Sequence, residues 1–407
     1  MPDEGCMMTE LLTKTAYALP EPNSRTKLTD VRKGTPTGEY LRRYWHPIAL
    51  AEEATELPCQ VRALGEDLIL FRDGSGKPGL VHPRCCHRGS SLFYGKVEQD
   101  GIRCCYHGWK FAVDGRCIDQ PLEKDGGGTA KNAVRQPWYP VRELYGLIFA
   151  YMGPPDKMPV LPRYDCFEDI PEGTQLETDG NSFGSMISST SVPFNWFQHY
   201  ENIHDMGHAF WLHQFHSGPQ FGEAFEGIPR EALPMINSAV HYERSPRGVL
   251  SRTMIPHPDG RFELKVIETV LPNLRLVAAH TPGKLDHISW VLPLDETSFR
   301  ILSVSANPEV FAFNNVLIAE RSKLSQKQRQ LYPGDFEAQG SQGLITAHNE
   351  EHLVSSDRGL VLLRRVFEEQ VDLVAGGGDP INVTFDPACQ VMQTEAGNWP
   401  MPEGAAA

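Results

Sequence analysis

The sequence lacks the features of a membrane, secreted or nucleic-acid-binding protein. No apolar run approaches the length of a membrane span, and the acidic start MPDEGCMMTELLTK has no apolar segment typical of a secretory signal. Acidic residues outnumber basic ones by 52 to 38, the net charge is -14, and no basic stripe offsets it. A polyanion would therefore be repelled, and we expect neither a nucleic-acid nor a membrane partner. The expected location is the cytoplasm.

Two further absences concern redox chemistry. The chain has no Rossmann or flavin motif of its own. It has nine cysteines, an odd number without a signal segment, which argues against a disulfide framework. Four of these cysteines lie between positions 85 and 105, and such clustering favours metal binding over packing.

The pattern of hydrophobic residues predicts an α+β protein. Residues 1–45 are expected to form a helical lead-in, and residues 46–160 an all-β domain with a hairpin turn at Asp114-Gly115. A proline-rich stretch near 154–165 marks a boundary. A second domain is expected at 161–375, with a helical stretch at 185–217, an antiparallel sheet at 235–305 and a long helix at 308–332. Residues 376–407 are expected to be a loop-like tail.

The cysteine cluster has a spacing that indicates a metal site. Cys85-x-His87 is followed, after 16 residues, by Cys104-x-x-His107. Zinc is a rival, since Cys₂His₂ is a zinc composition, but zinc modules pair two cysteines on one loop. Here each loop supplies one cysteine and one histidine, which suits a [2Fe-2S] cluster of the Rieske type, with two cysteines on one iron and two histidines on the other.

The two loops CCHRGSSLFYG and CCYHGWKF resemble the Rieske domain of the aromatic ring-hydroxylating oxygenases. In the register of that family, Cys85 and Cys104 are ligands, and Cys86 and Cys105 stand where proline is common. The resemblance implies an all-β Rieske domain plus a catalytic domain in which helices wrap an antiparallel sheet, a helix-grip arrangement. It covers roughly residues 40–370.

A second stretch decides between an electron carrier and an enzyme. NWFQHYENIHDMGHAFWLHQFH, at 195–216, contains Asn202, Asp205, His208 and His213 in a spacing similar to the mononuclear iron motif of the same family. A histidine-rich helix is, taken alone, more often a packed or solvated face. On an ideal helix His208 and His213 are about 140° apart, so the helix must bend, bulge or end between them for both to reach one metal.

The resemblance also implies the remaining site roles. Two histidines, His208 and His213, and one carboxylate would form a facial triad on Fe(II), with Asp335 as the carboxylate and Glu337 as the next choice. Asp205 would bridge His208 to the cluster histidine His107 of a neighbouring subunit. The plain alternative is that Asp205 caps a helix.

The implied function is that of a terminal oxygenase. A separate NAD(P)H reductase, with or without a ferredoxin, would supply electrons, and the cross-subunit path would require a homotrimer, with pairing of trimers left open. The leading substrate hypothesis is O-demethylation of a methoxylated, lignin-derived biphenyl-type aromatic acid by dioxygen, giving a phenol and formaldehyde. Ring hydroxylation of an aromatic carboxylate such as a phthalate or benzoate is the runner-up. A Rieske carrier or a zinc module is the alternative from another class.

Residues for a substrate pocket are less specific in the sequence. Several phenylalanines near the iron motif could line an apolar pocket, although most are expected to be core: Phe194, Phe210, Phe215, Phe221 and Phe225. Four arginines could bind a carboxylate, although such residues are more often surface charges: Arg230, Arg244, Arg247 and Arg252.

Overall fold

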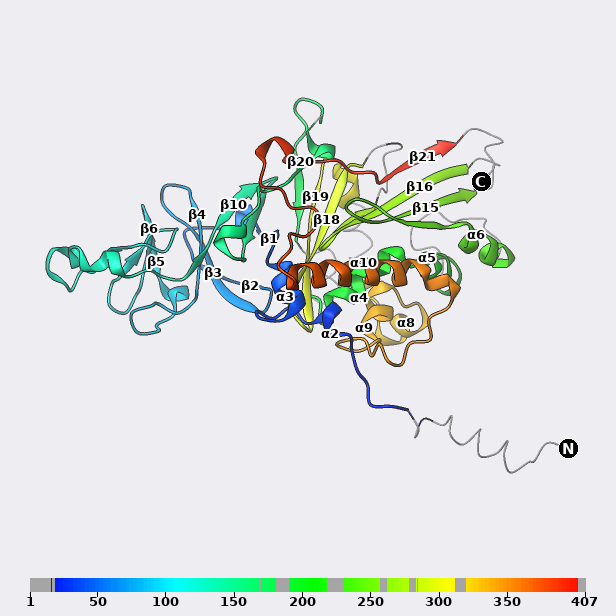
Figure 1. Cartoon of the computed structure of the whole chain (residues 1–407), viewed down its shortest axis with the longest axis horizontal. Coiled ribbons are helices and arrows are strands. Elements are labelled where there is room, and N and C mark those ends of the chain that lie inside the picture. The colour runs from blue at the N-terminus through cyan, green and yellow to red at the C-terminus, as the bar shows by residue number, and fades with distance from the viewer. Residues whose placement is uncertain are drawn as a thin grey trace.

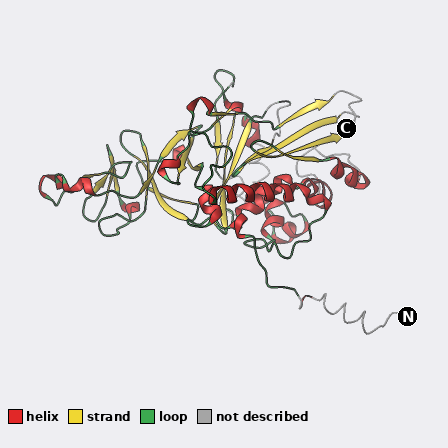
Figure 2. Ribbon diagram, in the orientation of Figure 1, coloured by secondary structure: helices red, strands yellow, loops and turns green. Residues whose placement is uncertain are grey.

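The computed structural model describes residue 16 and residues 19–401, except 169, 181–189, 218–229, 257–261, 278–282, 284 and 312–319. Small sheets occupy one end of the molecule, and a large sheet with helices along one side occupies the other (Figures 1 and 2). No described helix is both long and apolar enough to span a bilayer.

Three antiparallel sheets form the region from residue 45 to 151. The first has the strand order β1-β11-β10, with bounds Trp45–Leu50, Leu147–Tyr151 and Val141–Leu144. The second has the order β2-β3-β4-β9, with bounds Cys59–Ala63, Glu66–Arg72, Pro78–Val81 and Trp138–Tyr139. The third has the order β5-β6-β7-β8, with bounds Lys96–Glu98, Gly101–Arg103, Lys110–Phe111 and Cys117–Asp119.

Two of the turns in this region follow directly from local sequence. Gly115 adopts φ +76° in the hairpin between β7 and β8, which confirms the turn predicted at Asp114-Gly115. Tyr145 and Gly146, with φ +56° and +76°, form a two-residue turn between β10 and β11. Positive φ at both central residues matches the twist of the flanking strands.

The predicted sheet at 235–305 is present and is antiparallel. Its strand order is β13-β19-β18-β17-β16-β15-β14, with bounds Glu177–Asp179, Ser298–Ser305, His287–Asp295, Leu274–Val277, Phe262–Val270, Gly248–Pro256 and His241–Arg244. The expected fold class, α+β with one all-β part, is confirmed.

Helices pack along one face of the large sheet. The helices here are α4, α5, α6, α9 and α10, with bounds Trp196–Glu201, Met206–Phe210, Leu233–Ala239, Asp335–Gly340 and Arg358–Ala375. The helix α10 contacts β14 and β15, and it also packs on α3, Pro36–Leu41, near the short helix α2, Thr26–Thr29. Its buried residues recur every three or four positions, as at Gly359, Leu363 and Phe367, because one face must be covered.

One hydrophobic core joins the N-terminal sheets to the large sheet. It includes Leu41 and Phe149 from the N-terminal region together with Leu276 and Trp290 of the large sheet. A second, smaller core is shared by the second and third sheets and includes Phe71 and Phe111. The domain boundaries expected at 45, 160 and 375 therefore stay predictions, because packing is continuous across the one near 160.

Two expectations about elements were wrong. The long helix expected at 308–332 is interrupted after residue 322, and a separate helix α8, Gln326–Leu331, begins where the Ser325 side chain accepts a hydrogen bond from the Gln328 amide. The tail is not all loop: β21, Gly397–Met401, pairs with residues 262–266 of β16, beyond the point where β17 stops pairing. β20, Val391–Met392, pairs in parallel with β12, Arg163–Tyr164. Pairings between segments so far apart in sequence leave no local pattern.

Candidate metal centres

Two loops of matching conformation carry the cysteine-histidine motifs. In the first, the Gly89 amide donates to the Cys85 carbonyl at 2.8 Å, and in the second the Gly108 amide donates to the Cys104 carbonyl at 3.1 Å. Gly89 and Gly108 adopt φ +78° and +72°, a conformation that glycine enters without steric cost. The sequence therefore folds two copies of one tight loop opposite each other.

Burial separates the four cysteines into two pairs. Cys85 and Cys104 are buried, whereas Cys86 and Cys105 are exposed. Burial, with the Cys104 thiol beside it, raises the pKa of Cys85 to about 12. A thiolate at this place therefore requires a metal cation, which would displace the proton.

The two histidines of the loops face one another. The rings of His87 and His107 are 4.6 Å apart, and the indole of Trp109 stacks on His87 at 4.4 Å. Nδ1 of His87 is buried and has no hydrogen-bond partner among the described residues. Burial and the neighbouring His87 lower the pKa of His107, which favours the neutral imidazole that binds metals. Two buried sulfurs, an unpartnered imidazole nitrogen and a neutral second imidazole fit a Rieske cluster.

Gln136 stabilises the first loop, although it lies outside both cysteine-histidine motifs and no sequence motif indicated this role. Its Oε1 accepts from the Cys86 amide at 2.8 Å, and its Nε2 donates to the carbonyls of His82 and Arg84. This fully buried side chain fixes the backbone on both sides of Cys85.

The helical stretch 196–216 changes its winding at the point where the spacing of the histidines requires it. The helices α4 and α5 are separated by a short 3₁₀ turn, and α5 continues into a π-helical turn, Trp211–His216. The Ser217 amide bonds to the Leu212 carbonyl, five residues back. Because such bonds join residues five apart, the turn brings His213 toward the side of His208.

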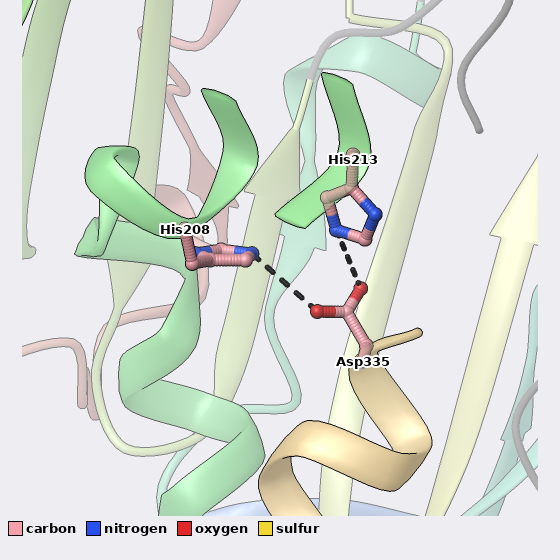
Figure 3. A group of neighbouring side chains, drawn as sticks. All are labelled: His208, His213 and Asp335. Carbon is pink, nitrogen blue, oxygen red and sulfur yellow. Dashed lines mark ion pairs between the residues drawn. The ribbon is translucent and has the colours of Figure 1, made fainter. Parts of the chain in front are cut away.

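His208, His213 and Asp335 converge from two separate segments (Figure 3). One ligand atom from each lies within 4.8 Å of the others. The Asp335 carboxylate places Oδ1 3.4 Å from His208 Nε2 and Oδ2 3.3 Å from His213 Nε2. Burial opposes ionisation of Asp335, but the two histidines outweigh it and hold the pKa of Asp335 well below its ordinary value. Two imidazoles around one ionised carboxylate suit a divalent metal.

Glu337, the next choice for the carboxylate ligand, and other acidic residues that follow it in the sequence have structural partners. Glu337 accepts from the Gly334 amide and pairs with Arg321 and Arg329. Glu351 pairs with Arg364, and Asp357 accepts from the Val354 amide.

The side chain of His208 is oriented by Asp205. Nδ1 of His208 bonds to the Asp205 carbonyl, and the Asp205 carboxylate caps α5 by accepting from the His208 amide at 3.2 Å. Because the carbonyl can only accept, Nδ1 carries the proton and Nε2 presents its lone pair toward Asp335. The Asn202 amide lies 3.1 Å from that same Nε2.

Most residues suggested for a substrate pocket have other contacts. Phe194 packs against Phe299 and Phe336, and Phe210 is in a core cluster. Phe215 lies near Trp211, while Phe221 and Phe225 fall outside the described residues. Arg230 stacks over Trp211, and the other three pair with glutamates: Arg244 with Glu369, Arg247 with Glu268 and Glu395, and Arg252 with Glu243 and Glu395.

Comparison with known proteins shows the family of this chain. Residues 44–139 match the Rieske [2Fe-2S] domain model. The chain is 45% identical over 381 residues to the phenoxybenzoate dioxygenase subunit alpha of Ectopseudomonas oleovorans, covering 92% of this chain and 91% of that protein. It is 32% identical over 377 residues to the 5,5'-dehydrodivanillate O-demethylase oxygenase subunit of Sphingobium sp. (strain NBRC 103272 / SYK-6), covering 89% and 83%.

A solved structure of dicamba monooxygenase bound to dicamba shares the fold, with 20% identity, a TM-score of 0.58, and coverage of 83% of this chain and 99% of that chain. The chain belongs to the Rieske non-haem iron aromatic oxygenases. Within that family it is a terminal oxygenase subunit, an oxidoreductase that uses a [2Fe-2S] cluster and a mononuclear iron.

Proposed function

We propose that Cys85, His87, Cys104 and His107 hold the cluster and that His208, His213 and Asp335 hold the iron. The observation that carries this proposal is the presence of two donor sets of different chemistry in one chain. Sulfur and imidazole at the first suit an iron-sulfur cluster, and imidazole and carboxylate at the second suit non-haem Fe(II). When bound, the iron supplies dioxygen binding and reduction, and the cluster supplies the electrons.

The second donor set argues against the alternative of a pure electron carrier. A carrier has no use for the His208–His213–Asp335 group, nor for the Asp205 and Asn202 contacts that orient His208. In the proposed enzyme Asp205 and Asn202 are positioning residues.

We infer a homotrimer from the arrangement of the two sites. The strands β5 and β6 next to the cluster loops lie at one end of the molecule, and α5 lies toward the other (Figure 1). Tyr106, beside His107, is exposed, and the Asp205 side chain is 31% exposed, so both sites reach a surface. A ring of three chains would place each cluster beside the Asp205 of its neighbour. A separate NAD(P)H reductase, with or without a ferredoxin, completes the system, and a cytoplasmic location remains a prediction.

The substrate we favour is an aromatic acid that carries an ether link, oxidised on the ring. Support comes from the relative with 45% identity across most of both chains, which is named for phenoxybenzoate and for dioxygenation. We therefore place ring oxidation ahead of O-demethylation, which was the leading hypothesis from the sequence resemblance.

O-demethylation is retained as the second candidate because the relative with 32% identity is an O-demethylase oxygenase subunit. Both reactions use the same iron chemistry, so the contacts of the substrate decide between them.

A single-turnover experiment distinguishes the two. Holoenzyme reduced without oxygen is mixed with dioxygen and 3-phenoxybenzoate, 3-methoxybenzoate or phthalate, and products are measured by mass spectrometry. A hydroxylated or dihydroxylated ring without formaldehyde supports the favoured reaction. Formaldehyde with a demethylated phenol supports the second candidate, and no oxidation of any acid by the intact holoenzyme contradicts both.

A further inference from the structure

Arg275 is a cation on the face of the sheet that covers the iron site. It lies on β17, opposite Thr269 of β16 and Ser289 of β18. Residues directly opposite on neighbouring strands share a face, and the Thr269 hydroxyl lies 3.0 Å from Nε2 of His204, in the helical stretch that carries the iron motif. The Arg275 side chain, which is not fully buried, therefore faces the site.

A directed chain of hydrogen bonds connects Arg275 to Asp335. Nη1 of Arg275 donates to Nε2 of His199, Nδ1 of His199 lies 3.0 Å from Gln339 Oε1, and Gln339 Nε2 donates to Asp335 Oδ1 at 3.4 Å. Because arginine can only donate, the proton of His199 must be on Nδ1, which then donates to Gln339. Burial and the adjacent Arg275 hold the pKa of His199 well below its ordinary value, in agreement with a neutral ring.

The guanidinium of Arg275 forms no ion pair with a described carboxylate, although the charge of Asp335 acts on it and raises its pKa against the larger effect of burial. Among the described residues none lies within ion-pair distance of its guanidinium, and only Nη1 has a hydrogen-bond partner. Burial lowers the pKa of Arg275 to about 10, so the group remains charged at neutral pH. The arginines Arg244, Arg247 and Arg252 all have glutamate partners instead.

This imbalance indicates that an anion belongs beside Arg275. A desolvated charge is costly unless it is paired, and a divalent metal at Asp335 would add more positive charge to the same site. The free Nε–Nη2 edge of a guanidinium accepts a carboxylate through two parallel hydrogen bonds.

We propose that Arg275 binds the carboxylate of the aromatic substrate and so directs the rest of the molecule toward the iron. This inference rests on the proposed function and deepens it, since it assigns the acid group of the substrate to one residue. His199 and Gln339 are positioning residues that hold Nη1 and leave the opposite edge free for the substrate.

Lys265 is a second cation on this face and provides a matched control. It lies on β16 four residues from Thr269, about 13 Å along the strand, and no ion pair joins it to a described residue. If the anion were bound there, Lys265 and not Arg275 would control affinity for the acid.

The test measures binding apart from turnover. Isothermal titration of anaerobic holoenzyme uses 3-phenoxybenzoate, its neutral analogue 3-phenoxytoluene, and benzoate. In Arg275→Gln we expect the Kd of both acids to rise about 100-fold and that of the neutral compound to change less than about threefold. Arg275→Lys keeps the charge but loses the paired N–H donors of the guanidinium, so its Kd for the acids should lie between those of the wild type and Arg275→Gln. Lys265→Met should bind the acids with the Kd of the wild type.

Several outcomes would overturn the inference. Equal loss of affinity for acid and neutral compound, or loss of mononuclear iron from Arg275→Gln, would give Arg275 a structural role only. Loss of acid binding in Lys265→Met, with binding retained in Arg275→Gln, would show that Lys265 binds the carboxylate. If the wild type binds neither acid, the proposed role of Arg275 in binding the carboxylate is wrong. If it binds 3-phenoxybenzoate without oxidising it, only the proposed reaction is wrong.

Discussion

At the scale of single residues, neighbours of the same type have different surroundings. Cys85 and Cys104 are buried while Cys86 and Cys105 are exposed, and Asp335 meets two histidines while Glu337, two positions away, meets two arginines. Such pairs allow a substitution at the proposed ligand to be compared with one at its neighbour.

Asp335→Asn should remove the mononuclear iron and leave the cluster. An amide is a weaker ligand than a carboxylate and carries no charge to balance the metal, so we expect iron per chain to fall from about three to about two and turnover to fall at least about 100-fold. Metal analysis and the visible spectrum of the cluster measure this. Glu337→Gln, the control, should retain the third iron, and its loss there would transfer the carboxylate role to Glu337.

Cys85→Ser should prevent cluster assembly, whereas Cys86→Ser should not. The first removes a buried sulfur and the second an exposed one. The measurement is the visible absorbance and the EPR signal of the reduced protein, and an intact cluster in Cys85→Ser would contradict the proposed register.

At the scale of elements, backbone conformation sets the geometry of both sites. Two glycine loops of one conformation oppose each other at the cluster, and a π-helical turn that contains His213 follows the helix α5 that carries His208. The helix α10 is tied to α4 by Arg364, which bonds Glu201 and Glu351 with four hydrogen bonds of 2.6 to 2.8 Å.

Gly108→Ala should disturb the cluster more than Gly89→Ala. Both glycines have positive φ, which costs another residue about 1–2 kcal/mol. At Gly108 an added Cβ would also lie 2.6 Å from Pro121, while at Gly89 it would meet nothing within 4 Å. Cluster content per chain and apparent Tm are measured for both variants. Equal effects of the two substitutions would contradict the prediction that Gly108→Ala is the more disruptive.

Arg364→Ala should destabilise the protein by about 3–5 kcal/mol, because it leaves a buried carboxylate, Glu201, without its partner. The neighbouring Arg365 is 67% exposed and lies 3.9 Å from Glu369, so Arg365→Ala should cost less than about 1 kcal/mol. Denaturant unfolding of the two variants makes the comparison.

At the scale of the whole molecule, burial of neutral histidines makes stability depend on pH. Burial lowers the pKa of His46 to about 4 and that of His204 to about 3. Between these values and about 6.5 the unfolded chain binds protons that the folded chain does not, so stability falls as pH falls through this window.

For His46 the full effect is about 3 kcal/mol, because its pKa is about 6.5 in the unfolded chain and about 4 in the folded one, and each tenfold change in proton affinity corresponds to about 1.36 kcal/mol. The apparent Tm of the wild type should therefore drop more steeply between pH 6.5 and 4.5 than that of His46→Gln. Acid effects on the cluster are common to the variant and the wild type and cancel in the comparison. Parallel curves of apparent Tm against pH would exclude His46 as a source of the pH dependence.

The sequence alone determined the class of this protein. The order and spacing of Cys85, His87, Cys104 and His107 indicated a Rieske-type cluster, because ligand chemistry demands those residue types at short range. The resemblance of the later stretch with His208 and His213 to the iron motif of the same family implied an oxygenase. The alternating strands from 241 to 305 could likewise be predicted from local periodicity. The break before α8 could not be predicted, because it depends on the capping of α8 by Ser325. The pairing of β21 with β16 could not be predicted either, because the two strands are far apart in the sequence.

The tertiary structure decided which distant groups meet. The resemblance had implied Asp335 as the carboxylate with Glu337 as the next choice, and the structure places Asp335 beside both histidines. Arg275, within the apolar strand LRLV, was not among the predicted site residues. The signal that could have found it was a charge on a strand otherwise apolar. The charge balance of a buried site depends on all the charged groups that the fold brings around it. Those groups come from segments far apart in the sequence, so no local sequence pattern predicts it.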